Sequence, residues 1–165
     1  MKFIQSEKDL NQKIHEKIKF FLWLIGKDSL PTNEKRKRNH LAASPACTIC
    51  SAAMEDADHL FRRCLDATSL WSVIALTMCV PPAQYNFQQW FASIMQSKQP
   101  LLLIATMWWL WRWRNDKVLG DDGWNRNQVM RFIWLDVQTL RRWPYLNTQK
   151  RIEETDLSQL RARPK

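Results

Sequence analysis

Residues 47–64 read CTICSAAMEDADHLFRRC, and this stretch decides how the chain is organised. It contains three of the four cysteines and one of the three histidines, in the spacing C-x2-C-x8-H-x4-C. Thiolate and imidazole are ligands that zinc prefers, and structural zinc sites are usually four-coordinate and closed. The spacing therefore predicts one zinc ion bound by Cys47, Cys50, His59 and Cys64.

The last two of these predicted ligands, His59 and Cys64, are five residues apart, a spacing that does not put two side chains on one face of an α-helix. Positions five apart in an ideal α-helix lie about 140° apart on its surface. His59 and Cys64 therefore cannot both face a metal from the middle of an α-helix. We expect His59 at a helix start and Cys64 near the helix end or just beyond it.

The cysteines allow two other interpretations. They could be ordinary buried thiols beside an unrelated histidine, or they could bind an iron–sulfur cluster, which normally takes four cysteines. Cys79 could supply the fourth, but it lies 15 residues beyond Cys64 in an apolar run. We interpret Cys79 as a core thiol and favour zinc.

Composition indicates a helical protein with an anionic partner. The 165 residues fit one domain with or without tails, 45% of them are hydrophobic, and ten tryptophans stand against three glycines. We predict a mainly α fold, a helical domain with a small zinc-stapled CCHC loop between helices. The formal net charge of +9 favours nucleic acid as the partner, and an acidic membrane surface second.

The first residues turn polar at once and lack a secretory signal pattern. The longest apolar run, residues 101–111, spans 11 residues, whereas a membrane span needs about 20. We expect a soluble, intracellular and nuclear protein with reduced cysteines and no membrane partner.

Apolar spacing predicts helices over residues 8–26, from Thr32 onward, and over 66–78, 86–97, 100–119 and 124–143, with Gly26 capping the first. The predicted division is an N-terminal extension (1–13), a zinc-binding domain (14–80), a Trp-rich helical extension (81–145) and a charged tail or linker (146–165). In the 100–119 helix, Trp108, Trp109, Trp111 and Trp113 could stack bases beside Arg112 and Arg114, but a packed core is favoured.

Basic residues cluster on both sides of the cysteine pair. Four of them are consecutive, and such a run is a nuclear-import signal, a phosphate-binding patch or simply a solvated charge run. The candidate nucleic-acid contacts are Lys35, Arg36, Lys37, Arg38, Arg62 and Arg63.

Several motifs together resemble the zinc-binding domain found downstream of reverse transcriptase in plant LINE-type, non-LTR retrotransposons. They are KIKFFLWLIGKDSLPT (17–32), CTIC, EDADHLFRRC (55–64), Trp71, and a W-x-x-R-N element at Trp111, Arg114 and Asn115. The resemblance is strong over residues 14–74 and continues more loosely to about residue 120. It implies the same four zinc ligands, Cys47, Cys50, His59 and Cys64. One departure is Arg36, where the family usually has an apolar residue.

No catalytic centre is evident. Gly120-Asp121-Asp122 spells a polymerase motif, but no strands flank it, and four protein ligands close the zinc site. We expect a non-enzymatic accessory module of a retrotransposon reverse transcriptase that binds nucleic acid, RNA more readily than DNA, next to the polymerase domain. The alternative is a structural or protein-interaction module, or a domesticated retroelement remnant, in which zinc only stabilises the fold.

Overall fold

The structure, a computed structural model, describes residues 14–76, 79–120 and 123–139. These residues form helices and turns without a β-strand, so the prediction of a mainly α fold is confirmed. The predicted N-terminal extension, the charged tail and the carboxylates of the polymerase-like motif lie outside the described residues. The elements are α2 (Glu16–Gly26), α3 (Asn33–Arg38), the π-helical turn η1 (His59–Arg63), α4 (Leu65–Ala75), α5 (Phe87–Met95), α6 (Pro100–Val118) and a helix over residues 126–139.

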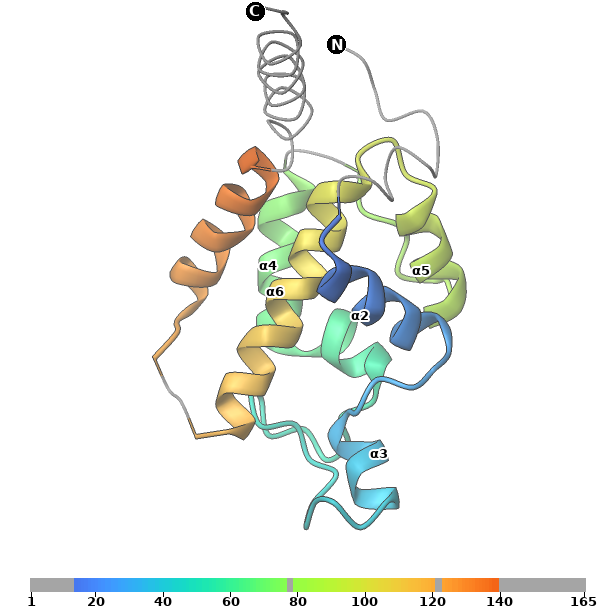
Figure 1. Cartoon of the computed structure of the whole chain (residues 1–165), viewed down its shortest axis with the longest axis vertical. Helices are drawn as coiled ribbons and strands as arrows, with labels where there is room; N and C mark the ends of the chain where they lie inside the picture. Colours follow the sequence, from blue (N-terminus) through green and yellow to red (C-terminus); the bar gives the residue numbers. More distant parts are fainter. Residues whose placement is uncertain (1–13, 77–78, 121–122, 140–165) are drawn as a thin grey trace, which may run out of the picture.

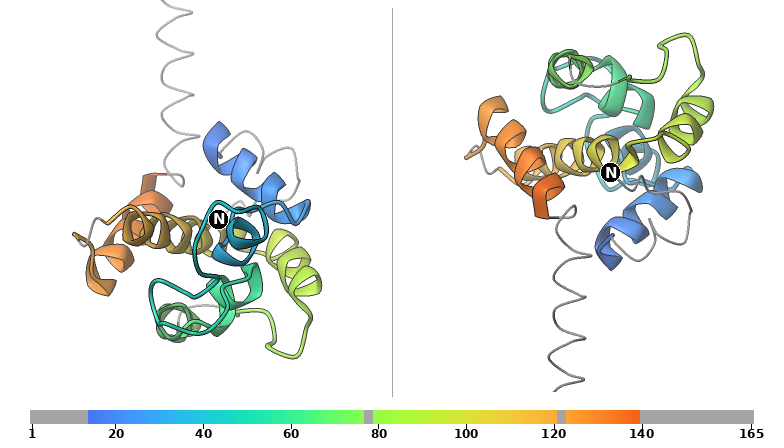
Figure 2. Two further views of the ribbon diagram at one scale, coloured as in Figure 1. Left: turned by 90° about the horizontal axis from the view of Figure 1, so that it is seen from below. Right: turned by 90° about the horizontal axis from the view of Figure 1, so that it is seen from above.

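Helix α6 lies at the centre of the molecule. Its first turns are apolar on every side, and each residue from Leu101 to Met107 is buried. Figures 1 and 2 show α6 between α2 on one side and α4 on the other, with α5 and the 126–139 helix at its flanks. A helix that is hydrophobic all round must be covered all round, and this arrangement covers it.

Local sequence signals explain where the helices begin. Pro100 occupies the first turn of α6, where its missing N–H costs nothing. Asn86 caps α5 through a reciprocal pair of hydrogen bonds with Gln89, and Asn125 and Gln128 repeat this capping box before the 126–139 helix. The pattern Asn-x-x-Gln therefore starts two helices and explains why the second begins later than predicted.

The end of α2 differs from the prediction. Gly26 is the last helical residue rather than the cap, Lys27 is the cap, and Asp28 takes the positive φ of 49°. Asp is among the few residues other than glycine that visit this region routinely, because its short polar side chain bonds locally. Thr32 does occupy the N-cap of α3 as predicted, although its side chain makes no capping bond.

The tryptophans of α6 pack inside the protein. Trp113 is buried and donates its indole N–H to the Trp124 carbonyl oxygen at 3.1 Å. Trp109 donates to Asp136 Oδ2 at 2.6 Å, and Trp108 packs edge-on against Phe21 with ring centroids 5.3 Å apart. These contacts favour the core interpretation over a base-stacking surface.

Residues from both predicted domains contribute to one hydrophobic core. The division at residue 80 stays a prediction. Among the described helices, none is both long enough and apolar enough to cross a membrane.

Candidate metal centre and basic surface

The CxxC pair lies in a tight turn that brings its two sulfur atoms together. The Ser51 N–H donates to the Cys47 carbonyl oxygen at 2.9 Å, and the Cys47 N–H donates to the Ala52 oxygen at 2.9 Å. Ser51 closes the turn with a positive φ of 62°. The short spacing between Cys47 and Cys50 is therefore fixed by backbone bonds that need no metal.

A π-helical turn allows the other two predicted ligands, His59 and Cys64, to lie on one side although they are five residues apart. The Cys64 N–H donates to the His59 carbonyl oxygen at 2.7 Å, which is the i→i+5 bond of a π-turn. Cys64 lies just beyond the end of this turn in an extended conformation. Asp56 caps the start by accepting from the His59 N–H at 2.6 Å. The expected placement is thus correct, and the widened turn brings both ligands to one side.

The four donor atoms converge. The sulfur atoms of Cys47, Cys50 and Cys64 and a ring nitrogen of His59 all lie within 4.8 Å of one another. Cys50 Sγ is 3.3 Å from His59 Nε2. Tetrahedral zinc with bonds of about 2.3 Å to sulfur and about 2.0 Å to nitrogen places its ligand atoms roughly 3.5–3.8 Å apart. The donor set and its spacing therefore fit zinc with small adjustments.

The surroundings favour a neutral imidazole at His59 and a thiolate at Cys64, whereas they favour the protonated thiol at Cys47. Burial, and secondarily Arg63, lowers the pKa of His59, which keeps its imidazole neutral. A hydrogen bond from the Cys47 thiol lowers the pKa of Cys64, and the N–H groups of Asp66 and Ala67 lower it further. Cys64 is the N-cap of α4, so the helix start supports its thiolate. The same Cys47–Cys64 bond, with burial, raises the pKa of Cys47.

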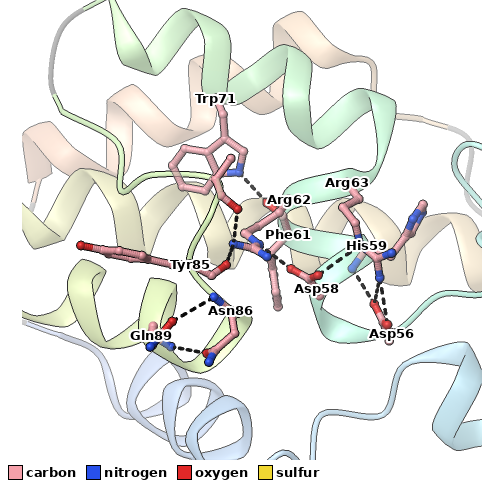
Figure 3. Close-up of polar contacts among 11 residues, drawn as sticks. Asp56, Asp58, His59, Phe61, Arg62, Arg63, Trp71, Tyr85, Asn86 and Gln89 are labelled. Carbon is pink, nitrogen blue, oxygen red and sulfur yellow. Dashed lines mark hydrogen bonds and ion pairs between the residues drawn. The ribbon is translucent and has the colours of Figure 1, made fainter.

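Side chains around the π-turn hold it in place, as Figure 3 shows. Arg63 reaches both carboxylate oxygens of Asp56 at 2.9 Å. Arg62 pairs with Asp58 and donates to the Tyr85 carbonyl oxygen at 2.7 Å, which ties the turn to the start of α5. Trp71 donates its indole N–H to the Phe61 oxygen at 2.6 Å.

A buried polar network joins the cysteine loop to two helices. Glu55 is fully buried, and its Oε1 accepts from the Asn33 N–H at 2.9 Å and from Arg114 Nε at 2.9 Å. Arg114 also donates to Asn33 Oδ1 at 2.6 Å, and Asn33 Nδ2 donates to the Ala46 oxygen at 2.7 Å. The network connects α3, α6 and the segments on both sides of the CxxC turn.

Arg114 lies in the packed core, which the sequence favoured over a base-stacking and phosphate-binding surface. Its side chain is 3% exposed and paired with Glu55, so no phosphate can reach it. The W-x-x-R-N motif could have indicated the network, because Arg114 lies over Trp111 and donates to Asn115 Oδ1. Nothing in the sequence marked Glu55 and Asn33 as its partners.

The six basic residues proposed for nucleic acid fall into different environments. Lys37 is exposed and has no partner among the described residues, and Arg38 is exposed but pairs with Glu34. Lys35 pairs with Asp28 at 2.8 Å, and Arg36 is half-buried beside Asn33. Lys35, Arg36 and Arg38, but not Lys37, line part of a surface pocket of about 330 Å³ beside α3.

The arginines of the π-turn are less available. Arg62 has a side chain that is 15% exposed and lies over the Trp90 ring. Arg63 is half exposed but spans two aspartates. Cys79 is exposed rather than part of the core, so its sequence interpretation is wrong, and it is not among the clustered donors.

Comparisons with known proteins agree with the geometry. Residues 4–71 match the family described as zinc-binding in reverse transcriptase. The chain is also 25% identical over 130 residues to a protein of Arabidopsis thaliana named "Putative ribonuclease H protein". That alignment covers 71% of this chain and 20% of the relative, so the chain spans about a fifth of that protein's length. No solved structure matches the chain significantly. The family resemblance seen in the motifs is thereby supported over residues 4–71, which match the family described as zinc-binding in reverse transcriptase.

Proposed function

We propose that this chain is a zinc-binding accessory module that holds RNA beside the polymerase domain of a retrotransposon reverse transcriptase, and that it has no catalytic activity of its own. The proposal extends to a nuclear location and to an element of the plant LINE type. The matched family and the ribonuclease H name of the Arabidopsis relative support this context.

The convergence of Cys47, Cys50, His59 and Cys64 is the observation that carries the zinc assignment. Four protein donors complete a tetrahedral shell and leave no position for a reacting water, which favours a structural role for the ion. The zinc would join the CxxC turn to the π-turn, in addition to the hydrogen bonds that already position them.

The RNA assignment rests on charge and exposure. Lys37 and Arg38 project from a short helix whose first residue, Asn33, is bonded to Glu55 and Arg114. A basic helix anchored in this way presents its charges at a fixed place relative to the metal centre. We assign phosphate contacts first to the exposed Lys37 and Arg38, then to the half-buried Lys35 and Arg36. Arg62 and Arg63 come last, because Arg62 is 15% exposed and Arg63 spans two aspartates.

The test is RNA affinity as a function of salt. A protein that neutralises phosphates loses affinity steeply with salt, with a slope of about −0.7 per contact for single strands. Lys37→Glu and Arg38→Glu together should weaken binding and make the slope shallower by about one to two contacts. Lys98→Glu, at an exposed site between α5 and α6, is the matched control. Unchanged affinity and slope in the double variant would contradict the role of α3.

A second candidate function also has an observation in its favour. Four of the six basic residues form ion pairs inside the chain, with Asp28, Glu34, Asp56 and Asp58. Much of the local charge thus holds the domain together, as expected of a structural or protein-interaction module. No RNA binding at low salt, together with a folded zinc-loaded protein, would favour this function.

A further inference from the structure

The outer face of α2 carries two aromatic side chains that the core does not use. Phe20 is 61% exposed and Trp23 is 54% exposed, whereas Ile18, Phe21 and Ile25 on the opposite face are buried. The two outer rings stack on each other, with centroids 5.8 Å apart and planes inclined by 16°. They form one continuous aromatic surface, which we call the α2 platform.

Lysines lie at both ends of the α2 platform. Lys17 and Lys27 are exposed, and neither ammonium group has a partner among the described residues. Ten residues of helix separate them, about 15 Å along the axis. By contrast, Lys19 on the side of the helix is paired with Glu16 at 2.6 Å. The two flanking positive charges are therefore free for an external anion.

We propose that the α2 platform binds unpaired bases of a single-stranded nucleic acid, with Lys17 and Lys27 contacting the flanking phosphates. The inference rests on the proposed RNA-binding function and assigns it a new site. Aromatic surfaces flanked by positive charge are the usual means of holding single strands, because every base has a π-face that stacks. Inside a duplex the faces of each base are covered by the stacked neighbouring pairs, so the platform distinguishes single strands from duplex.

The charges argue against a second copy of this chain as the occupant. Two α2 helices packed antiparallel would place Lys17 of one opposite Lys27 of the other, and like charges repel. A nucleic acid instead neutralises both.

The α2 platform is followed along the chain by the basic helix α3. Lys27 is followed by Asp28, whose carboxylate pairs with Lys35 of α3 at 2.8 Å. Asp28 and Lys35 also line the pocket of about 330 Å³ together with Arg36 and Arg38. Figure 1 shows α3 following α2 after a short connection. A single-stranded nucleic acid that stacks on Phe20 and Trp23 and passes Lys27 therefore reaches the exposed charges of α3.

The experiment measures the affinity of the zinc-loaded full chain for an oligouridine of about 12 nucleotides by fluorescence anisotropy. Phe20→Leu with Trp23→Leu keeps the surface apolar but removes stacking, whereas Phe20→Tyr with Trp23→Phe keeps both aromatic rings. We expect the leucine pair to bind at least about tenfold more weakly and the aromatic pair to bind like the wild type. Binding to a duplex should be the same in all three. Thermal melting checks folding, which these exposed positions should not disturb.

The outcomes separate this site from the general function. Equal oligouridine affinity in the leucine pair, with weaker binding in Lys37→Glu, Arg38→Glu, would overturn the α2 platform and leave RNA binding intact. No binding by the wild type would overturn both. The wild type could instead self-associate. If the leucine pair retains this association and Lys17→Glu strengthens it, the surface of another protein molecule occupies the α2 platform.

Discussion

Arg114 and Glu55 lie 59 residues apart in the sequence and form a buried ion pair, with Arg114 Nη2 2.7 Å from Glu55 Oε1. Glu55 belongs to the loop between the metal-binding cysteines and His59, and Arg114 belongs to α6. The pair therefore makes the position of the cysteine loop depend on the Trp-rich helix.

Replacing Arg114 with methionine should strongly lower the free energy of unfolding. The change leaves the Glu55 carboxylate buried without its counter-ion, and breaking one side of a buried pair costs about 3–5 kcal/mol. Chemical denaturation of the zinc-loaded chain measures the loss. Arg112→Met is the control, because Arg112 is exposed and lies over Trp109 and Trp124. A loss below about 1 kcal/mol for Arg114→Met would show that water or another group compensates the carboxylate.

Purified protein should contain one zinc ion per chain, measured by mass spectrometry. Cys47→Ser and His59→Ala should each lose it, with loss of cooperative melting, because zinc binding and folding are coupled in structural sites. Cys79→Ser should keep the zinc, since Cys79 is exposed and outside the cluster. Retention of zinc by His59→Ala at full occupancy would exclude the imidazole as a ligand.

The Asn86 capping box should contribute about 1 kcal/mol to the free energy of unfolding of the protein. Asn86→Ala removes the acceptor for the Gln89 N–H and leaves a donor at the start of α5 without its partner. The measurement is the midpoint of urea unfolding. Gln84→Ala, two residues earlier at an exposed position, should leave the midpoint unchanged. Equal midpoints for both variants would mean that water satisfies the helix start equally well.

The clustering of Cys47, Cys50, His59 and Cys64 was predictable because metal chemistry restricts residue types and spacing. Even the placement of His59 and Cys64 followed from helix geometry, although the π-turn that achieves it was not foreseen. The partners of Arg114 were not predictable, because Glu55 and Asn33 look like ordinary surface residues in the sequence and acquire their role only through tertiary contacts. The exposure of Cys79 was missed for the same reason. An apolar stretch of sequence does not show which of its residues the tertiary contacts bury.

Trp71→Phe should weaken the support of the π-turn without removing a metal ligand. Trp71 is buried and donates its indole N–H to the Phe61 oxygen at 2.6 Å, and phenylalanine fills most of its volume without this donor. An unpaired buried acceptor costs about 1–3 kcal/mol, so the melting temperature should fall. Because His59 and Cys64 lie on either side of Phe61, the zinc affinity should fall too, at unchanged stoichiometry. Trp23→Phe, at an exposed position, is the matched control, and an equal zinc affinity in both variants would contradict the link between this bond and the metal centre.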